Sequence, residues 1–157
     1  MSAEKTAPPS VILKPLPSSG ADLTQDFERY QYYHLGRMQG LSALLRNRLN
    51  HAIRQTRDYD KLVLSIALNY GGRAEIVDAV RRMISAGLRP EDVTEESLSG
   101  YLYTAGLPDP DLVVRTAGEM RLSNFLIWQA AYAEFYSTPI FWPDFDREEL
   151  LKALAAF

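Results

Sequence analysis

The chain has 157 residues, a formal net charge of −3 and no cysteine, and it is long enough to bury the core of one domain. Its acidic balance excludes a general nucleic-acid binder, which would carry a basic face, and the lack of cysteine excludes disulfides, thiolate metal sites and cysteine nucleophiles. The sequence shows no apolar run that could span a bilayer and no signal peptide. We therefore expect a cytoplasmic protein that binds no nucleic acid and makes at most peripheral membrane contact.

The first 22 residues differ in composition from the rest of the chain. They are rich in Pro, Ser and Ala, and their prolines interrupt any regular hydrogen-bonding ladder. We predict that residues 1–22 form a flexible arm, with docking of the apolar run at 11–13 onto a neighbour as the alternative. Residues 23–157 are predicted to form a single domain.

The elements that follow alternate between strand and helix patterns. Residues 23–29 fit a short helix, and residues 30–35 are aromatic enough for a strand. Residues 41–57 carry apolar side chains at helical spacing. Residues 62–68 (LVLSIAL) are nearly continuous in apolar character, which is typical of a strand covered on both faces. This strand should be the centre of the sheet, and a helix should follow the turn at 69–73.

That helix is predicted to turn an apolar stripe toward the core. The stripe consists of Ile76, Val77, Val80, Met83 and Ile84. The helix should end near Gly87, and Thr94 should cap a short helix beyond it. The alternation of strands and helices predicts an α/β fold with a mostly parallel sheet flanked by helices.

The stretch from residue 111 to residue 134 (DLVVRTAGEMRLSNFLIWQAAYAE) carries the clearest chemical signal. Its short apolar run predicts a buried strand, and Arg115 follows at the carboxyl end, where open α/β sheets bind ligands. Residues 123–124 (Ser-Asn) are expected to cap a helix that begins near Phe125. The guanidiniums of Arg115 and Arg121, beside a helix N-terminus, predict a binding site for a diphosphate.

A structural role is the alternative for these two arginines. Glu119 and Asp111 lie close enough in the sequence to form ion pairs with Arg115 and Arg121. Such pairs would engage the guanidiniums within the protein instead of leaving them for a ligand.

The runs RTAGEMRLSNFLIWQAAYAEFY and FWPDF resemble the C-terminal signature of the cis-prenyltransferases, the undecaprenyl or polyprenyl diphosphate synthases. The runs LVLSIALNYGGRAEIVDAVRRM and LYTAGLPDPDLVVRT are similar to the family's middle portion, so the resemblance covers residues 30–157. It implies a truncated cis-prenyltransferase-like fold and a transferase that condenses isopentenyl diphosphate with an allylic diphosphate, forming a cis-polyprenyl diphosphate. It also implies Mg²⁺ as the cofactor, and either a homodimer or a heteromer with a related chain.

The resemblance also implies roles for individual residues. The diphosphate of isopentenyl diphosphate would be held by Arg115, Arg121, Ser123 and the backbone of Leu122. Glu119 is expected to orient the arginines.

Three other residues are candidates for supporting roles. Glu134, which we place on the predicted helix about three turns after Ser123, matches the family position associated with Mg²⁺, and a carboxylate is a suitable ligand for that ion. Asn69 and Arg73 are predicted secondary contacts, for which a purely structural role is equally open.

The Asp-Gly-Asn-x-Arg motif, which carries the central catalytic aspartate of the family, does not occur in this sequence. The resemblance therefore transfers the isopentenyl half of the site and leaves the catalytic residues unknown. Three functions follow. The chain is a polyprenyl diphosphate synthase, an accessory subunit that binds isopentenyl diphosphate or a full-length partner, or an unrelated α/β phosphate-binding module.

Overall fold

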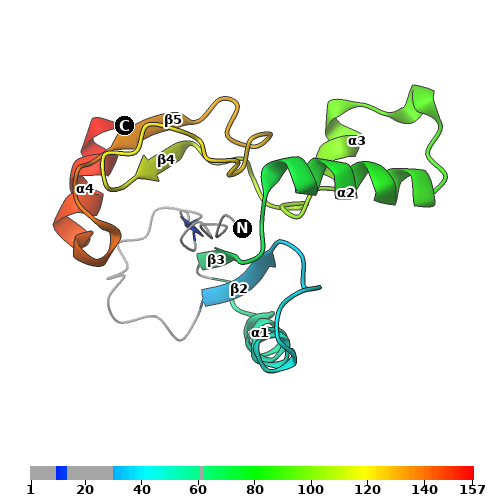
Figure 1. Cartoon of the computed structure of the whole chain (residues 1–157), viewed down its shortest axis with the longest axis horizontal. Helices are drawn as coiled ribbons and strands as arrows, with labels where there is room; N and C mark the ends of the chain where they lie inside the picture. Colours follow the sequence, from blue (N-terminus) through cyan, green and yellow to red (C-terminus); the bar gives the residue numbers. More distant parts are fainter. Residues whose placement is uncertain (1–9, 14–29, 61) are drawn as a thin grey trace, which may run out of the picture. The chain divides into compact units, whose positions relative to one another are not determined.

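The computed structural model describes residues 10–13, 30–60 and 62–157. The chain forms two compact units, residues 1–106 and residues 107–157, and each has its own sheet (Figure 1). Each sheet contains one parallel strand pair, and helices accompany both. The α/β class predicted from the sequence is therefore confirmed. A single domain over residues 23–157 stays a prediction.

The first unit is built on a three-stranded sheet. Strand β3 (Leu62–Ala67) lies between β1 (Ser10–Leu13) and β2 (Tyr30–Leu35). Strands β2 and β3 are parallel and pair along their whole length, whereas β1 runs antiparallel to β3. The apolar run at 62–68 thus forms the central strand, as predicted, because a strand with a neighbour on each edge has its backbone groups paired on both sides.

Strand β1 lies inside the segment that we expected to be an irregular arm. Its backbone pairs with β3 from Ser10 opposite Ala67 to Leu13 opposite Leu64. Backbone pairing of this kind gives four residues regular structure despite the prolines on either side. The rest of the predicted arm and the helix predicted at 23–29 lie outside the described residues.

Helix α1 (Ala43–Thr56) packs along β2, close to the bounds predicted for it. The Ser42 hydroxyl caps its first turn by accepting a hydrogen bond from the Leu45 N–H (3.3 Å). At its other end, the Thr56 hydroxyl accepts a hydrogen bond from the Tyr32 N–H of β2 (3.0 Å). This bond satisfies a backbone donor on a strand that is an edge of the three-stranded sheet.

Helix α2 (Gly72–Ser85) buries a different stripe from the one predicted. Its buried residues are Gly72, Glu75, Ala79 and Met83. Three of the predicted core residues are instead 42–71% exposed, namely Val77, Val80 and Ile84. The prediction was wrong for these three residues.

Glu75 explains how α2 is rotated. Its side chain is 1% exposed, and its carboxyl oxygens accept hydrogen bonds from the Tyr103 N–H (2.7 Å) and from the Tyr70 hydroxyl. A buried carboxyl group is tolerated only when it is hydrogen-bonded. These bonds hold the Glu75 face inward, and the small residues on the same face, such as Ala79, allow close packing.

The end of α2 and the short helix α3 (Glu95–Ser99) follow the sequence signals. Gly87 adopts a left-handed backbone (φ +76°) just after α2, as a helix-ending glycine does. The Thr94 hydroxyl accepts from the Ser97 N–H (3.1 Å), and the Ser97 hydroxyl accepts from the Thr94 N–H (2.8 Å). This reciprocal capping box confirms the predicted cap of α3.

Gly36 marks a close approach of two backbones at the carboxyl ends of β2 and β3. It has φ +123°, and a Cβ atom built on it would lie 2.3 Å from the Leu68 carbonyl oxygen. The approach is fixed on both sides of Gly36, because the Leu68 N–H donates to the Leu35 carbonyl (3.1 Å) and the Arg37 N–H donates to the Asn69 carbonyl (3.1 Å). Only glycine fits this position without moving the backbone.

The second unit is built on the parallel pair β4 (Leu112–Arg115) and β5 (Glu134–Ser137), with α4 (Arg147–Ala156) following along the chain. The pairing continues past the strands, where the Thr138 N–H donates to the Arg115 carbonyl (2.9 Å). The Asp146 carboxylate caps α4. The helix predicted from residue 147 onward is confirmed.

The helix predicted to begin near Phe125 does not form. Between β4 and β5 the chain makes a series of turns. Ser123, Asn124 and Leu126 have positive φ angles of 53°, 61° and 45°. Left-handed residues cannot propagate a right-handed helix, so Ser123 is not a helix cap, and the predicted helix N-terminus is not part of the site.

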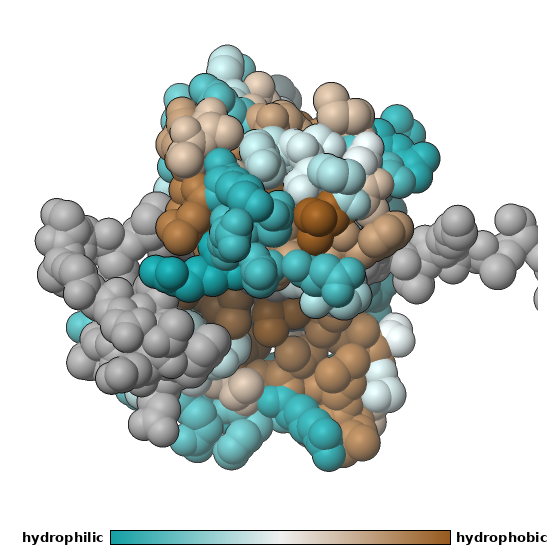
Figure 2. Space-filling view, turned by 90° about the vertical axis from the view of Figure 1, so that its left-hand side faces the viewer, coloured by the Kyte–Doolittle hydropathy of each residue, from teal (hydrophilic) through white to brown (hydrophobic). Residues whose placement is uncertain are grey.

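Apolar side chains reach the surface in both units, and brown areas mark apolar residues on the face drawn in Figure 2. In the second unit Phe135, Phe141 and Trp142 are each about half exposed or more. Within the described residues, no helix combines the length and the apolar character needed to cross a bilayer.

Candidate functional site

Arg115 ends β4 at the carboxyl edge of the parallel pair, where the sequence predicted it. Its Nη2 lies 3.4 Å from the Ser123 hydroxyl oxygen. Its Nε is buried and has no hydrogen-bond partner among the described residues. Buried donors are almost always satisfied, so this guanidinium N–H calls for an acceptor from outside the described residues.

Arg121 is held by Glu119 in a two-point ion pair. The Arg121 Nε is 2.7 Å from Glu119 Oε2, and its Nη2 donates to Oε1 at 2.9 Å. The Glu119 backbone is anchored in turn, because its carbonyl accepts from the Ser137 hydroxyl (3.1 Å). The Arg121 side chain is 76% exposed. An ion pair this exposed contributes little stability and can exchange with another anion.

In the structure, Ser123 contacts Arg115, and Glu119 forms an ion pair with Arg121. Of the two ion pairs offered as the structural alternative, the Glu119–Arg121 pair is present. Leu122 lies between the two groups along the chain, and its carbonyl accepts from the Phe125 N–H (3.1 Å). The second unit thus presents two guanidiniums and one hydroxyl in a short segment, which is a suitable set of donors for phosphate oxygens.

Glu134 is separated from this group. It is the first residue of β5, not part of a helix, and it stands opposite Leu112, whereas Arg115 stands opposite Ser137. Three residues of strand correspond to roughly 10 Å along the chain direction. In the described part of the chain, no cluster of three or more acidic or histidine side chains could hold a metal ion. Glu134 therefore does not lie beside Arg115 in the strand pair, and its assignment to Mg²⁺ stays a prediction.

Asn69 and Arg73 belong to the first unit. Asn69 has a left-handed backbone (φ 51°), and its Nδ2 donates to the carbonyls of Arg37 (3.0 Å) and Gln39 (2.8 Å). This side chain closes the loop after β2, which is the structural role left open by the sequence. Arg73 is exposed in the first turn of α2.

Comparison with known proteins places this chain in a family. Residues 18–157 match the prenyltransferase family model described as "Putative undecaprenyl diphosphate synthase". The chain belongs to this family. The isoprenyl transferase of Fusobacterium nucleatum is 48% identical over 129 residues, covering 82% of this chain and 55% of that protein. The isoprenyl transferase of Streptococcus pyogenes is 55% identical over 117 residues, covering 69% and 47%.

Solved structures of the family agree in fold. Lavandulyl diphosphate synthase from Lavandula x intermedia, in complex with dimethylallyl diphosphate, aligns with a TM-score of 0.79 and 36% identity over 85% of this chain and 59% of that one. A probable undecaprenyl diphosphate synthase from Campylobacter jejuni aligns with a TM-score of 0.73 and 30% identity over 83% and 62%. The chain spans about half the length of the curated relatives it matches.

The first unit contains a charged cluster that the sequence analysis did not single out. Arg37 donates two hydrogen bonds to the Asp78 carboxylate, from Nε to Oδ2 (2.7 Å) and from Nη2 to Oδ1 (2.9 Å). The Tyr103 hydroxyl donates to Oδ2 (2.5 Å), and Arg81 Nη1 lies 3.4 Å from Oδ1. The sequence does contain a signal for this cluster, because Arg37 lies just beyond the carboxyl end of the parallel strand β2. The partners of Arg37 are distant from it in the sequence, so the sequence alone does not reveal that these side chains contact one another.

This cluster predicts a loss of stability in acid. Hydrogen bonds from Arg37 and then Tyr103 lower the pKa of Asp78 from 3.8 to about 2. Because the folded pKa is depressed, the stabilisation is complete above about pH 4 and is lost as the pH falls toward 2. Asp78→Asn should lower the free energy of unfolding by about 1 kcal/mol at neutral pH, and the difference from wild type should shrink below pH 4.

Urea denaturation at several pH values measures this difference. Asp58→Asn is the matched control, because the Arg57–Asp58 pair is exposed by 73% and 82% and should add little stability at any pH. If Asp78→Asn and Asp58→Asn behaved alike from pH 7 to pH 2, the stabilising role of the Asp78 carboxylate would be rejected.

Proposed function

We propose that the chain binds the diphosphate of isopentenyl diphosphate and works as a polyprenyl diphosphate synthase-type transferase. One observation carries the proposal. The Arg115 Nε, at the carboxyl end of a parallel strand and beside Ser123, is buried and has no hydrogen-bond partner in the part of the chain that the structure describes. Membership of the prenyltransferase family supports the substrate class. The bound dimethylallyl diphosphate of the lavandulyl diphosphate synthase supports an allylic diphosphate as the second substrate.

In this proposal the arginines bind and orient the nucleophilic substrate. Arg115 and Arg121 neutralise the diphosphate, and the Ser123 hydroxyl donates a further hydrogen bond. The isopentenyl double bond then attacks the allylic carbon, the allylic carbon–oxygen bond breaks with release of diphosphate, and a proton leaves to set the cis double bond. The protein contributes position and fixed positive charge, which need no proton transfer because a guanidinium stays charged.

Mg²⁺ and its assignment to Glu134 stay predictions. Glu134 offers one carboxylate at the far end of the strand pair from Arg115, so we derive no step through a metal. We further propose a cytoplasmic dimer or a heteromer with a related chain. The exposed aromatic side chains of the second unit, Phe135, Phe141 and Trp142, support a partner contact.

Incorporation of radiolabelled isopentenyl diphosphate tests the function directly. The purified chain is assayed with an allylic diphosphate, alone and mixed with a full-length relative. Product formed by the chain alone supports the transferase. If the chain forms no product alone but the mixture forms more product than the relative does alone, the chain acts as an accessory subunit, which is the alternative function. No incorporation and no effect on the relative would refute both.

A further inference from the structure

A pocket of about 620 Å³ opens in the first unit beside the carboxyl end of β2 and the adjacent face of α2. All of its lining residues belong to the first unit. Gly36 to Gln39 line one side, and residues of α2 together with Tyr103 line the other. The pocket therefore lies at the carboxyl end of a parallel strand, the edge at which open α/β sheets bind ligands.

The charges lining this pocket are mainly positive. Arg37, Arg81 and Arg82 contribute three guanidiniums, and Asp78 contributes the one carboxylate among the lining residues. This excess stands out in a chain whose formal net charge is −3. A concave surface with two uncompensated positive charges attracts a dianion.

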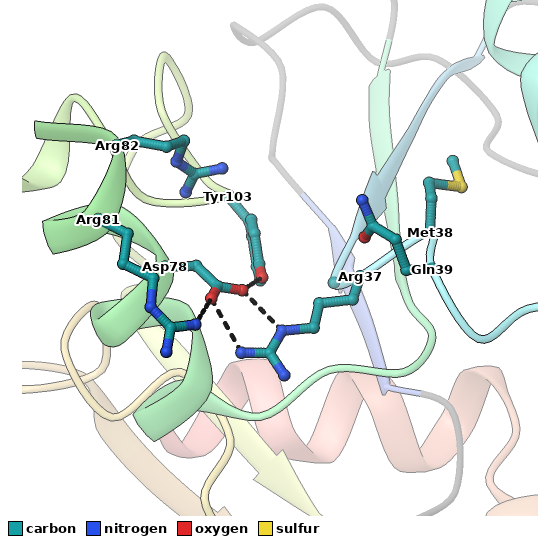
Figure 3. Close-up of a pocket in the computed structure, with 8 residues that line it drawn as sticks. Arg37, Met38, Gln39, Asp78, Arg81, Arg82 and Tyr103 are labelled. Atoms are coloured by element: carbon teal, nitrogen blue, oxygen red, sulfur yellow. Dashed lines mark hydrogen bonds and ion pairs between the residues drawn. The ribbon is translucent and has the colours of Figure 1, made fainter. Parts of the chain in front are cut away.

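The guanidiniums are held in place before any ligand arrives. Arg37 and Arg81 both reach the Asp78 carboxylate, and Figure 3 shows their side chains converging on it from different sides. Arg82 donates to the Tyr101 carbonyl, and its guanidinium carbon lies 5.1 Å from the centroid of the Tyr103 ring. Fixed donors lose little conformational freedom on binding, which favours affinity.

The Asp78 carboxylate does not block an anion. Both of its oxygens are engaged, Oδ2 by Arg37 Nε and the Tyr103 hydroxyl, and Oδ1 by Arg37 Nη2 and Arg81 Nη1. Its negative charge is thereby compensated within the cluster. Each guanidinium carries five N–H donors, so Arg37 and Arg81 retain donors beyond those that Asp78 uses.

We propose that this pocket binds a dianionic phosphate group, either inorganic phosphate or the head of a phosphate monoester. Planar guanidinium forks match phosphate oxygens in geometry and charge. The Gln39 amide and the Arg82 guanidinium supply further donors at its rim, and Met38 offers apolar surface to the organic part of an ester.

Calorimetric titration of the full chain with inorganic phosphate tests the proposal. The titrations use the Arg121→Ala background, so that the arginine pair of the second unit does not dominate the signal. Arg81→Ala should weaken phosphate binding roughly ten- to hundredfold. Arg81 is the appropriate site, because its side chain is 71% exposed and its removal leaves the Arg37–Asp78 bridge intact.

Arg54→Ala is the charge-matched control, since Arg54 is an exposed residue of α1 outside the pocket. It should leave phosphate affinity unchanged, and Arg82→Ala should weaken it as Arg81→Ala does. A parallel titration with glycerol phosphate identifies the source, because tighter binding than inorganic phosphate indicates a monoester. The proposal is overturned if millimolar phosphate shows no saturable binding, or if Arg54→Ala weakens binding as much as Arg81→Ala.

Discussion

Replacement of Gly36 by alanine should lower the free energy of unfolding by roughly 3–5 kcal/mol, at the upper end of single-residue effects. The new Cβ would lie 2.3 Å from the Leu68 carbonyl oxygen and 2.9 Å from that of Asn69. Neither oxygen can move away freely, because the Asn69 carbonyl accepts from the Arg37 N–H and the flanking strands are hydrogen-bonded to each other. Urea denaturation followed by circular dichroism measures the loss.

Gly87→Ala is the control for backbone conformation alone. Gly87 also has a positive φ, +76°, but a Cβ built there would meet nothing within 4 Å. This variant should lose only about 1 kcal/mol, the usual cost of a left-handed alanine. Equal losses for the two variants would mean that backbone conformation, and not the close approach of β2 and β3, makes glycine necessary at position 36.

Arg121→Ala should reduce the affinity for isopentenyl diphosphate roughly ten- to hundredfold while leaving the fold intact. The substitution removes a charged donor, and it also leaves the Glu119 carboxylate without its 2.7 Å partner, beside the incoming anion. The arginine side chain is 76% exposed, so the loss of packing is small. Calorimetry gives the affinity, and circular dichroism checks the fold.

Two variants make the result specific. Arg121→Lys keeps the charge but loses the fork, so its affinity should lie between those of wild type and Arg121→Ala. Arg147→Ala removes the same charge from an exposed position in the second unit and should bind normally. An Arg121→Ala protein with wild-type affinity would remove Arg121 from the proposed diphosphate site.

Local patterns predicted several elements with close bounds. The aromatic run became the edge strand β2 and the apolar run became the central strand β3, because aromatic and β-branched side chains favour strands. The cap of α3 at Thr94 and the last helix were predicted for the same kind of reason. In each case the residues that decide the structure are neighbours in the sequence.

The failed predictions share a different cause. The rotation of α2 depends on hydrogen bonds from Tyr70 and Tyr103 to Glu75, and the second of these spans 28 positions of the chain. The helix expected near Phe125 rests on the Ser-Asn capping pattern at residues 123–124, which does not reveal the left-handed backbone at Ser123 and Leu126. In both cases the local sequence pattern does not contain the interaction or the backbone conformation that decides the structure.

The sequence by itself determined the family, the α/β class and the identity of the arginine, serine and glutamate side chains that bear on diphosphate chemistry. The tertiary structure decided which of them meet. It paired Arg121 with Glu119, set Arg115 beside Ser123 and placed Glu134 at the opposite end of the strand pair. It also assembled Arg37, Asp78 and Tyr103, because contacts between residues distant along the chain arise only when strands and helices pack.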